Sequence, residues 1–168
     1  EALPLPPPWP EDDGGLRFVK RAYNPEGTAP KPVVSNVRFF DLDGDGRLEV
    51  VACDMGHGVV YLGEPVEKPG EVREVARIPN PDHAEMVDLD KDGKLDLVTA
   101  DQEDATASVL MGNGNGSFAP RVVYGACTKA HETAVGDLNG DTWPDVAIAC
   151  HATTLIAVLL NDGTGGLL

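Results

Sequence analysis

Aromatic and basic residues are scarce in this chain of 168 residues. Aromatics make up 5%, and 13 Lys and Arg stand against 28 Asp and Glu, so the formal net charge is −15. Because nucleic acids and anionic membrane surfaces attract basic patches, this balance argues against both as partners. No apolar run approaches the roughly 20 residues of a membrane-spanning helix, so we expect no membrane span. The chain begins at Glu1 without a signal-peptide stretch, as a processed mature chain would.

Cysteine is also scarce, with three residues at Cys53, Cys127 and Cys150. None belongs to a Cys-x-x-Cys pair, which argues against a zinc ribbon or covalently attached haem. The simplest interpretation makes Cys53 and Cys150 small core residues at the ends of strands. The alternative is a Cys127–Cys150 disulfide, which would suit a secreted, periplasmic or cell-surface protein.

Glycine and proline are abundant instead, with 19 and 14 residues. This composition is typical of short strands joined by tight turns, and it predicts an all-β chain. Proline is dense in residues 1–32, which we expect to form a Pro-rich N-terminal arm with one strand at residues 16–23. Residues 33–168 contain a different pattern.

Three acidic loops begin at Asp41, Asp88 and Asp137, which lie 47 and then 49 residues apart. Each has an oxygen-bearing side chain at positions 1, 3, 5 and 9, a spacing suited to Ca²⁺, and the carbonyl of position 7 would add a ligand. The sequence therefore predicts up to three Ca²⁺ sites. The predicted ligands are Asp41, Asp43, Asp45, Arg47 and Glu49 in loop one, Asp88, Asp90, Asp92, Lys94 and Asp96 in loop two, and Asp137, Asn139, Asp141, Trp143 and Asp145 in loop three.

These loops differ from EF-hands in two ways. An EF-hand needs flanking helices and a bidentate Glu at position 12, where this chain has Ala52, Thr99 and Ile148. The flanking segments are rich in β-branched and small apolar residues, as in strands. We therefore expect calcium loops on β-hairpins. The residue at position 8, which is Leu48, Leu95 or Pro144, is expected to pack into the core beneath the ion.

The flanking segments repeat together with the loops. Each loop lies between two strand-like segments, and a third follows. Two glycine-rich turns, at residues 112–118 and 161–167, come after the third segment of the second and third units. A period near 50 with several short strands is typical of a propeller blade or a β-solenoid unit. The expected strands are 34–40, 50–53 and 58–62; 83–87, 97–100 and 107–111; and 132–136, 146–149 and 156–160.

On its acidic loops and on the glycine-rich segments 110–118 and 159–167, the chain resembles the FG-GAP/VCBS repeat family, which occurs in integrin α-subunit propellers and bacterial surface proteins. The resemblance covers roughly residues 33–168. It implies about three propeller-blade-like antiparallel repeats of 47–49 residues that carry calcium loops. Closed propellers need about four to eight blades, so the expected fold is a partial or open propeller. Thr142 replaces the usual glycine and Asn139 an aspartate, so loop three should be the weakest site.

These features favour an extracellular calcium-binding module for interaction, adhesion or assembly, with calcium as a structural staple and no enzymatic activity. Its expected partners are other subunits or copies of itself, bound through open sheet edges or the N-terminal arm, with glycans as a further class. The alternative is an accessory or catalytic propeller domain of a carbohydrate-active enzyme of the lyase type. The acid–base candidates would be His57, His83, His131 and His151, but no hydrolase motif accompanies them.

Overall fold

The computed structural model describes residues 33–63 and 73–168, and eleven strands make up the regular structure of that part. The predicted N-terminal arm and its strand at 16–23 lie outside the described residues. No helix within them is long and apolar enough to cross a membrane. The strands are β1 Val34–Phe40, β2 Glu49–Asp54, β3 Val59–Gly63, β4 Arg73–Arg77, β5 Pro81–Val87, β6 Asp96–Asp101, β7 Thr106–Leu110, β8 Val122–Gly125, β9 Ala130–Gly136, β10 Asp145–Cys150 and β11 Ile156–Leu159.

The strands form three antiparallel sheets, ordered β1-β2-β3-β4, β5-β6-β7-β8 and β9-β10-β11. The first hairpin has the same register in each sheet, with the pairs Phe39–Val50, Met86–Leu97 and Val135–Val146. The sequence offsets between these pairs equal those between the acidic loops. The prediction of an all-β fold with three blade-like repeats in an open arrangement is confirmed, although β4 and β8 were not predicted.

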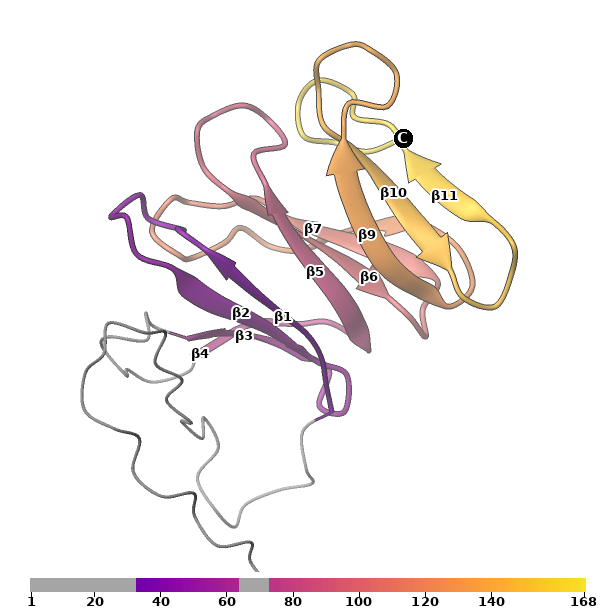
Figure 1. Cartoon of the computed structure of the whole chain (residues 1–168), viewed down its shortest axis with the longest axis horizontal. Coiled ribbons are helices and arrows are strands. Elements are labelled where there is room, and N and C mark those ends of the chain that lie inside the picture. The colour runs from indigo at the N-terminus through magenta and orange to yellow at the C-terminus, as the bar shows by residue number, and fades with distance from the viewer. Residues whose placement is uncertain (1–32, 64–72) are drawn as a thin grey trace, which may run out of the picture.

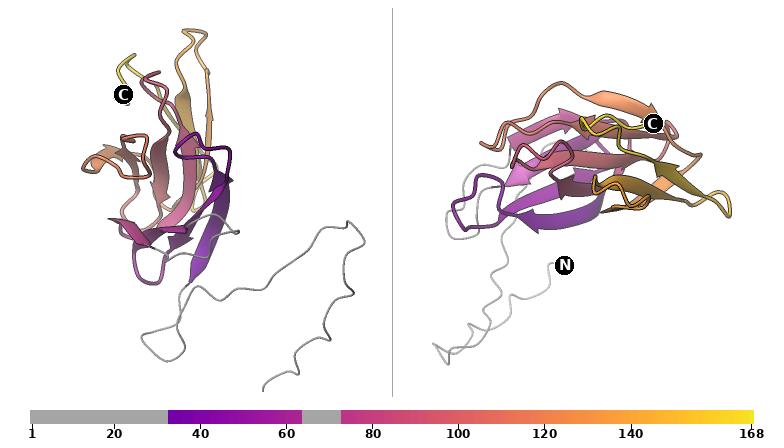
Figure 2. Two further views of the ribbon diagram at one scale, coloured as in Figure 1. Left: turned by 90° about the vertical axis from the view of Figure 1, so that its left-hand side faces the viewer. Right: turned by 90° about the horizontal axis from the view of Figure 1, so that it is seen from above.

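The three sheets lie side by side in chain order (Figure 1). The first strands are neighbours, because β1 contacts β5 and β5 contacts β9. The turned views agree that each sheet occupies its own layer (Figure 2). The arrangement is open, since β1–β4 and β9–β11 are the two ends of the series and do not meet.

Two hydrophobic clusters hold the layers together. The first joins residues such as Val51 and Leu62 of the first sheet to Leu97 and Leu110 of the second. The second joins Val98 and Val109 to residues of the third sheet. Because successive side chains of a strand point to opposite faces, neighbouring residues of β6 serve different clusters. This explains why every residue of β6 is buried.

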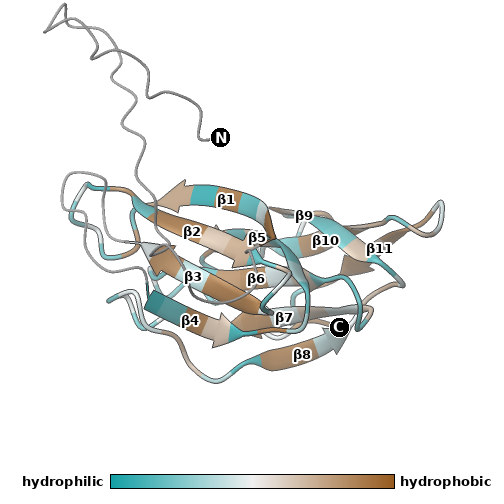
Figure 3. Cartoon of the chain, turned by 90° about the horizontal axis from the view of Figure 1, so that it is seen from below, coloured by the Kyte–Doolittle hydropathy of each residue, from teal (hydrophilic) through white to brown (hydrophobic). Residues whose placement is uncertain are grey.

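Hydropathy follows this layering, with apolar segments mainly on strands and β1 carrying both polar and apolar bands (Figure 3). Cys127 and Cys150 form a disulfide that connects the segment before β9 to the end of β10. Cys53 is a free, buried thiol, and burial raises its pKa to about 12, with the charges of Asp82 and Asp101 adding to the shift. The cysteines thus divide into one core thiol and one covalent link.

Truncation of Leu97 should show how much the stability depends on the contact between the first and second sheets. Leu97→Ala removes a fully buried side chain and is expected to lower the free energy of unfolding by about 2–5 kcal/mol. The matched control is Leu155→Ala, because Leu155 is exposed. Urea denaturation measures both variants, and equal losses of stability would contradict the packing described above.

Candidate metal loops

The three acidic loops occupy equivalent places in the fold. They connect β1 to β2, β5 to β6 and β9 to β10, and they lie along the same side of the molecule (Figure 1). Each loop therefore closes the first hairpin of its sheet, so the paired strands hold both of its ends.

The acidic side chains of each loop accept hydrogen bonds from the loop backbone. Position 1 accepts from the N–H of position 6, position 3 from position 5, and position 5 from position 7. These bonds turn the chain back on itself and draw the acidic side chains together. The position 1 bonds are Asp41–Gly46 at 3.0 Å, Asp88–Gly93 at 3.0 Å and Asp137–Thr142 at 2.9 Å; the others are Asp43–Asp45, Asp90–Asp92 and Asn139–Asp141, and Asp45–Arg47, Asp92–Lys94 and Asp141–Trp143.

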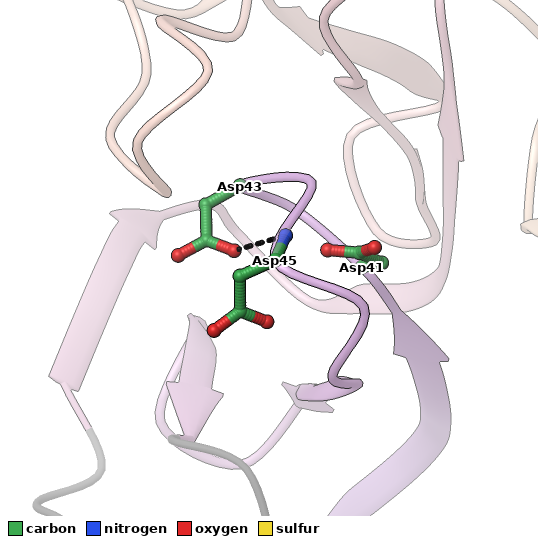
Figure 4. Close-up of side chains that lie close together, drawn as sticks. All are labelled: Asp41, Asp43 and Asp45. Atoms are coloured by element: carbon green, nitrogen blue, oxygen red, sulfur yellow. Dashed lines mark hydrogen bonds between the residues drawn. The ribbon is translucent and has the colours of Figure 1, made fainter.

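In loop one, carboxylate oxygens of Asp41, Asp43 and Asp45 all lie within 4.8 Å of one another. Figure 4 shows these side chains on the loop, with the Asp45 N–H donating to Asp43. Glu49, the predicted ligand at position 9, lies outside this group. Its carboxylate accepts a hydrogen bond from the Leu42 N–H at 2.8 Å, and burial raises its pKa.

In loop two, the corresponding group consists of Asp88, Asp90 and Asp96, again within 4.8 Å. The Oδ1 atom of Asp88 is buried and has no hydrogen-bond partner. Burial raises the pKa of Asp96, and the charges of Asp90 and Asp92 add to the shift. Asp92, also a predicted ligand, forms a salt bridge with Lys94 instead. Loop two thus contains a buried acceptor oxygen beside two further carboxylates.

The carboxylate at position 9 organises all three loops. Glu49, Asp96 and Asp145 are buried, and each accepts the backbone N–H of position 2. In the second and third sheets, its other oxygen accepts the N–H of Gly112 at 2.7 Å or of Asn161 at 2.8 Å. This carboxylate therefore joins the acidic loop to the glycine-rich turn. At Gly112 a Cβ atom would collide with the carbonyl oxygen of Leu95, so glycine is required there.

The expectation that position 8 packs beneath the ion is wrong for Leu48, which is exposed. Position 2 takes that place instead, since Leu42 and Leu89 are buried in the first and second hydrophobic clusters. The N–H of position 2 donates to the buried carboxylate in all three loops. Leu138 makes this bond and is still 54% exposed, so burial of position 2 also needs a neighbouring sheet. Leu95, at position 8 of loop two, is partly buried and packs against the first cluster.

Loop three differs from the other two. Asn139 donates its side-chain amide to Asp141, and among the described residues loop three has no group of three close carboxylates. Thr142 has a φ of 78°, a left-handed conformation that a β-branched residue adopts only under strain. Lys91 of loop two donates to Thr142 Oγ1 at 2.9 Å and lies 4.4 Å from the centroid of the Trp143 ring. The positive charge of Lys91 beside loop three opposes binding of a metal cation there.

The four histidines do not converge on one site. The His57 side chain lies 2.6 Å from Asp54, whereas His131 lies 3.2 Å from Asp82 and stacks at 5.3 Å on His151. Burial raises the pKa of Asp82, and its two histidine neighbours lower it. These pairs lie on different sheets, so the structure forms no joint acid–base centre from them.

His83 belongs to a polar chain across the first strands of the three sheets. Its two ring nitrogens contact Arg38 of β1 at 2.9 Å and Thr133 of β9 at 2.7 Å. Arg38 also donates to Glu85 of β5 at 2.6 Å. Burial lowers the pKa of His83, and the positive charge of Arg38 lowers it further. Sequence reasoning missed this link, because partners 45 and 50 residues away leave no local signal.

Asp101 should make the stability depend on pH. It is fully buried and accepts hydrogen bonds from Thr99, Ser108 and Thr106; burial raises its pKa although these bonds lower it. A carboxyl group whose pKa is higher in the folded chain than in the unfolded chain stabilises the folded state at pH values below the unfolded pKa. This stabilisation is lost as the pH rises through the folded pKa. Asp101→Asn should therefore gain stability relative to the wild type as pH rises. Urea denaturation midpoints, measured in chelator across the pH range in which carboxyl groups titrate, test this prediction, with Asp104→Asn as the exposed control. A stability difference between Asp101→Asn and the wild type that does not change with pH would contradict it.

Replacement of Thr142 by glycine should relieve strain in loop three. Glycine adopts a φ of 78° freely, so Thr142→Gly is expected to raise the free energy of unfolding by about 1 kcal/mol, the strain of roughly 1–3 kcal/mol less the entropy cost of glycine. Thr128→Gly, at an exposed turn without positive φ, should lower stability instead. Thermal unfolding in chelator compares the two variants, and a loss of stability in both would refute the strain.

Comparison with known proteins agrees with this architecture. A family model described as an FG-GAP-like repeat matches residues 88–148, which run from the first residue of loop two into β10. No curated protein matches the chain. A solved structure of similar fold is a lectin from Agrocybe aegerita, described as specifically recognising non-reducing terminal N-acetylglucosamine; the TM-score is 0.53 with 21% identity over 77% of this chain and 36% of the lectin chain.

At this identity the likeness to the lectin concerns the fold alone, and this chain spans about a third of the lectin's length. The family match carries more weight, because it includes loops two and three and the strands β6 to β9 between them. Its boundaries also contain β6, whose residues face both hydrophobic clusters. Residues 88–148 therefore match an FG-GAP-like repeat, and the three sheets of the described residues agree with a repeat of that kind.

Proposed function

We propose that this protein is an extracytoplasmic β-repeat module that binds calcium in its acidic loops as a structural staple and serves in interaction, adhesion or assembly with other proteins. One observation supports the metal site above others. In loop two, the buried and unpartnered Oδ1 of Asp88 lies in a group with carboxylate oxygens of Asp90 and Asp96.

The chemistry of the donors suits Ca²⁺. A buried acceptor without a partner is costly, and a cation would satisfy it. All the candidate ligands are oxygen atoms, which hard cations such as Ca²⁺ prefer, and their number exceeds what Mg²⁺ takes from protein side chains. Three ions would add +6 to the formal charge of −15 and bring it to −9. The residues of loop two fit the ion best, and those of loop three fit it least.

A structural role follows from the position of the loops. Each loop closes a hairpin and is tied by its position 9 carboxylate to the core, so an ion bound there would stabilise the folded chain rather than a mobile segment. The extracytoplasmic location is supported by the Cys127–Cys150 disulfide, since disulfides persist mainly in oxidising compartments.

An enzymatic role of the lyase type is the alternative. The His131–Asp82 pair is the arrangement that would serve acid–base chemistry, but it lies on strands rather than beside the acidic loops. A lyase assay on polysaccharides, run together with glycan-array binding, separates the two functions. Turnover that His131→Ala abolishes would favour the enzyme, and glycan binding without turnover would favour the module.

Removal of calcium should lower the melting temperature. At a calcium concentration of one hundred times Kd, a single site adds about 2.7 kcal/mol to the free energy of unfolding. Asp88→Asn should lose most of the stabilisation from loop two, whereas Asp137→Asn should lose less and Asp104→Asn, in an exposed turn, none. Calorimetric melting in calcium and in chelator measures these differences. An equal melting temperature of the wild type in both buffers would refute the calcium proposal.

A further inference from the structure

The outer face of the third sheet carries the same repeat positions that form an interface between the second and third sheets. We call Leu138, Ala147, Ala149, Ile156 and Val158 the third-sheet face. The equivalent residues 49 positions earlier are Leu89, Val98, Ala100, Ala107 and Val109, and all five are buried in the cluster between the second and third sheets. The same positions thus make an interface in one sheet and face outward in the next.

Exposure measures the difference between these equivalent positions. Leu89 is 0% exposed, whereas Leu138 is 54% exposed. Ala107 is likewise 0% exposed, and its equivalent Ile156 is 70% exposed. In β10 and β11 the apolar pairs Ala147–Val158 and Ala149–Ile156 lie in register, so these residues form one continuous surface. Exposing such a surface to water is unfavourable, and larger apolar patches of this kind mark interaction sites.

The opposite end of the series shows the complementary face. Val37 and Phe39 of β1 are exposed, with Phe39 at 54%. They lie 47 residues before Ala84 and Met86, which the second sheet buries against the first. We call Val37, Phe39 and the pairing residue Val50 the first-sheet face. The exposed residues of this face are therefore the repeat equivalents of the residues by which the second sheet packs on the first.

From this equivalence we propose that the third-sheet face binds the first-sheet face of a second copy of the chain, head to tail. The inference rests on the proposed role in assembly and names its partner and surface. The contact would continue the series of stacked sheets already seen twice within one chain. It involves faces of the sheets, whereas the sequence had suggested their edges.

In this arrangement a second copy covers the first-sheet face and the third-sheet face at once. Head-to-tail contacts form rings when the rotation closes. The described residues of two copies contribute six sheets, within the four to eight blades of closed propellers. In such a ring each copy uses its first-sheet face in one contact and its third-sheet face in the other, so neither apolar face stays in water.

Two variants with one damaged face each test the proposal. Ile156→Asp disables the third-sheet face and Phe39→Asp the first-sheet face, and Val123→Asp places the same charge on an exposed position of β8, outside both faces. Light scattering coupled to size exclusion, in calcium and over a dilution series, gives the mass. The wild type and Val123→Asp should reach twice the chain mass of 17.7 kDa, and each face variant alone should keep the mass of one chain.

An equimolar mixture of the two face variants is the decisive sample. Each supplies the intact face that the other lacks, so the mixture should regain a two-chain species. The head-to-tail contact would be overturned if Phe39→Asp still dimerised alone or if the mixture kept the mass of one chain. Circular dichroism spectra and melting temperatures like those of the wild type confirm that the variants fold. A wild type that stays at one chain yet melts lower in chelator would overturn the docking inference and leave the calcium proposal standing.

Discussion

The buried carboxylate at position 9 of each acidic loop is the interaction on which the other parts of the structure depend. In all three loops it accepts the N–H of position 2, and in the second and third sheets it also accepts the N–H that begins the glycine-rich turn. A buried carboxylate is costly unless it is hydrogen-bonded, so these bonds define where both segments lie. They place the acidic side chains at the end of the hairpin, and in the first two loops position 2 packs against the core.

Stacking of equivalent faces is the second constraint. Each sheet carries apolar residues on both faces, but only the second sheet has a neighbour on both sides among the described residues. The polar chain from Arg38 through His83 to Thr133 aligns the first strands, which keeps the three sheets in one series. An open series built in this way has two different end faces. Their apolar residues are equivalent to those that form the contacts between sheets inside the series.

Much of the fold and of the candidate site followed from local patterns. The strands that flank each loop were predictable because alternating apolar residues and tight turns act over a few residues. β4 and β8 were not, since their outward residues lack a clear alternation. The exposed Leu48 and the buried Leu42 show the limit of such reasoning, because burial of position 2 depends on packing between sheets, as the exposed Leu138 shows. The sequence distinguished loop three from the others by Thr142 and Asn139, whereas the approach of Lys91 was not foreseen.

The sequence by itself determined the repeat, the all-β class and the oxygen-rich loops, because each of these depends on spacing within one unit of about 50 residues. The tertiary structure alone decided which carboxylates gather, which leucine is buried and which faces stay exposed. These outcomes depend on contacts between units, such as Asn161 donating to the Leu89 carbonyl 72 residues earlier. Residues so far apart meet only when the sheets stack, and stacking depends on the free energy of burying whole faces rather than on any local pattern.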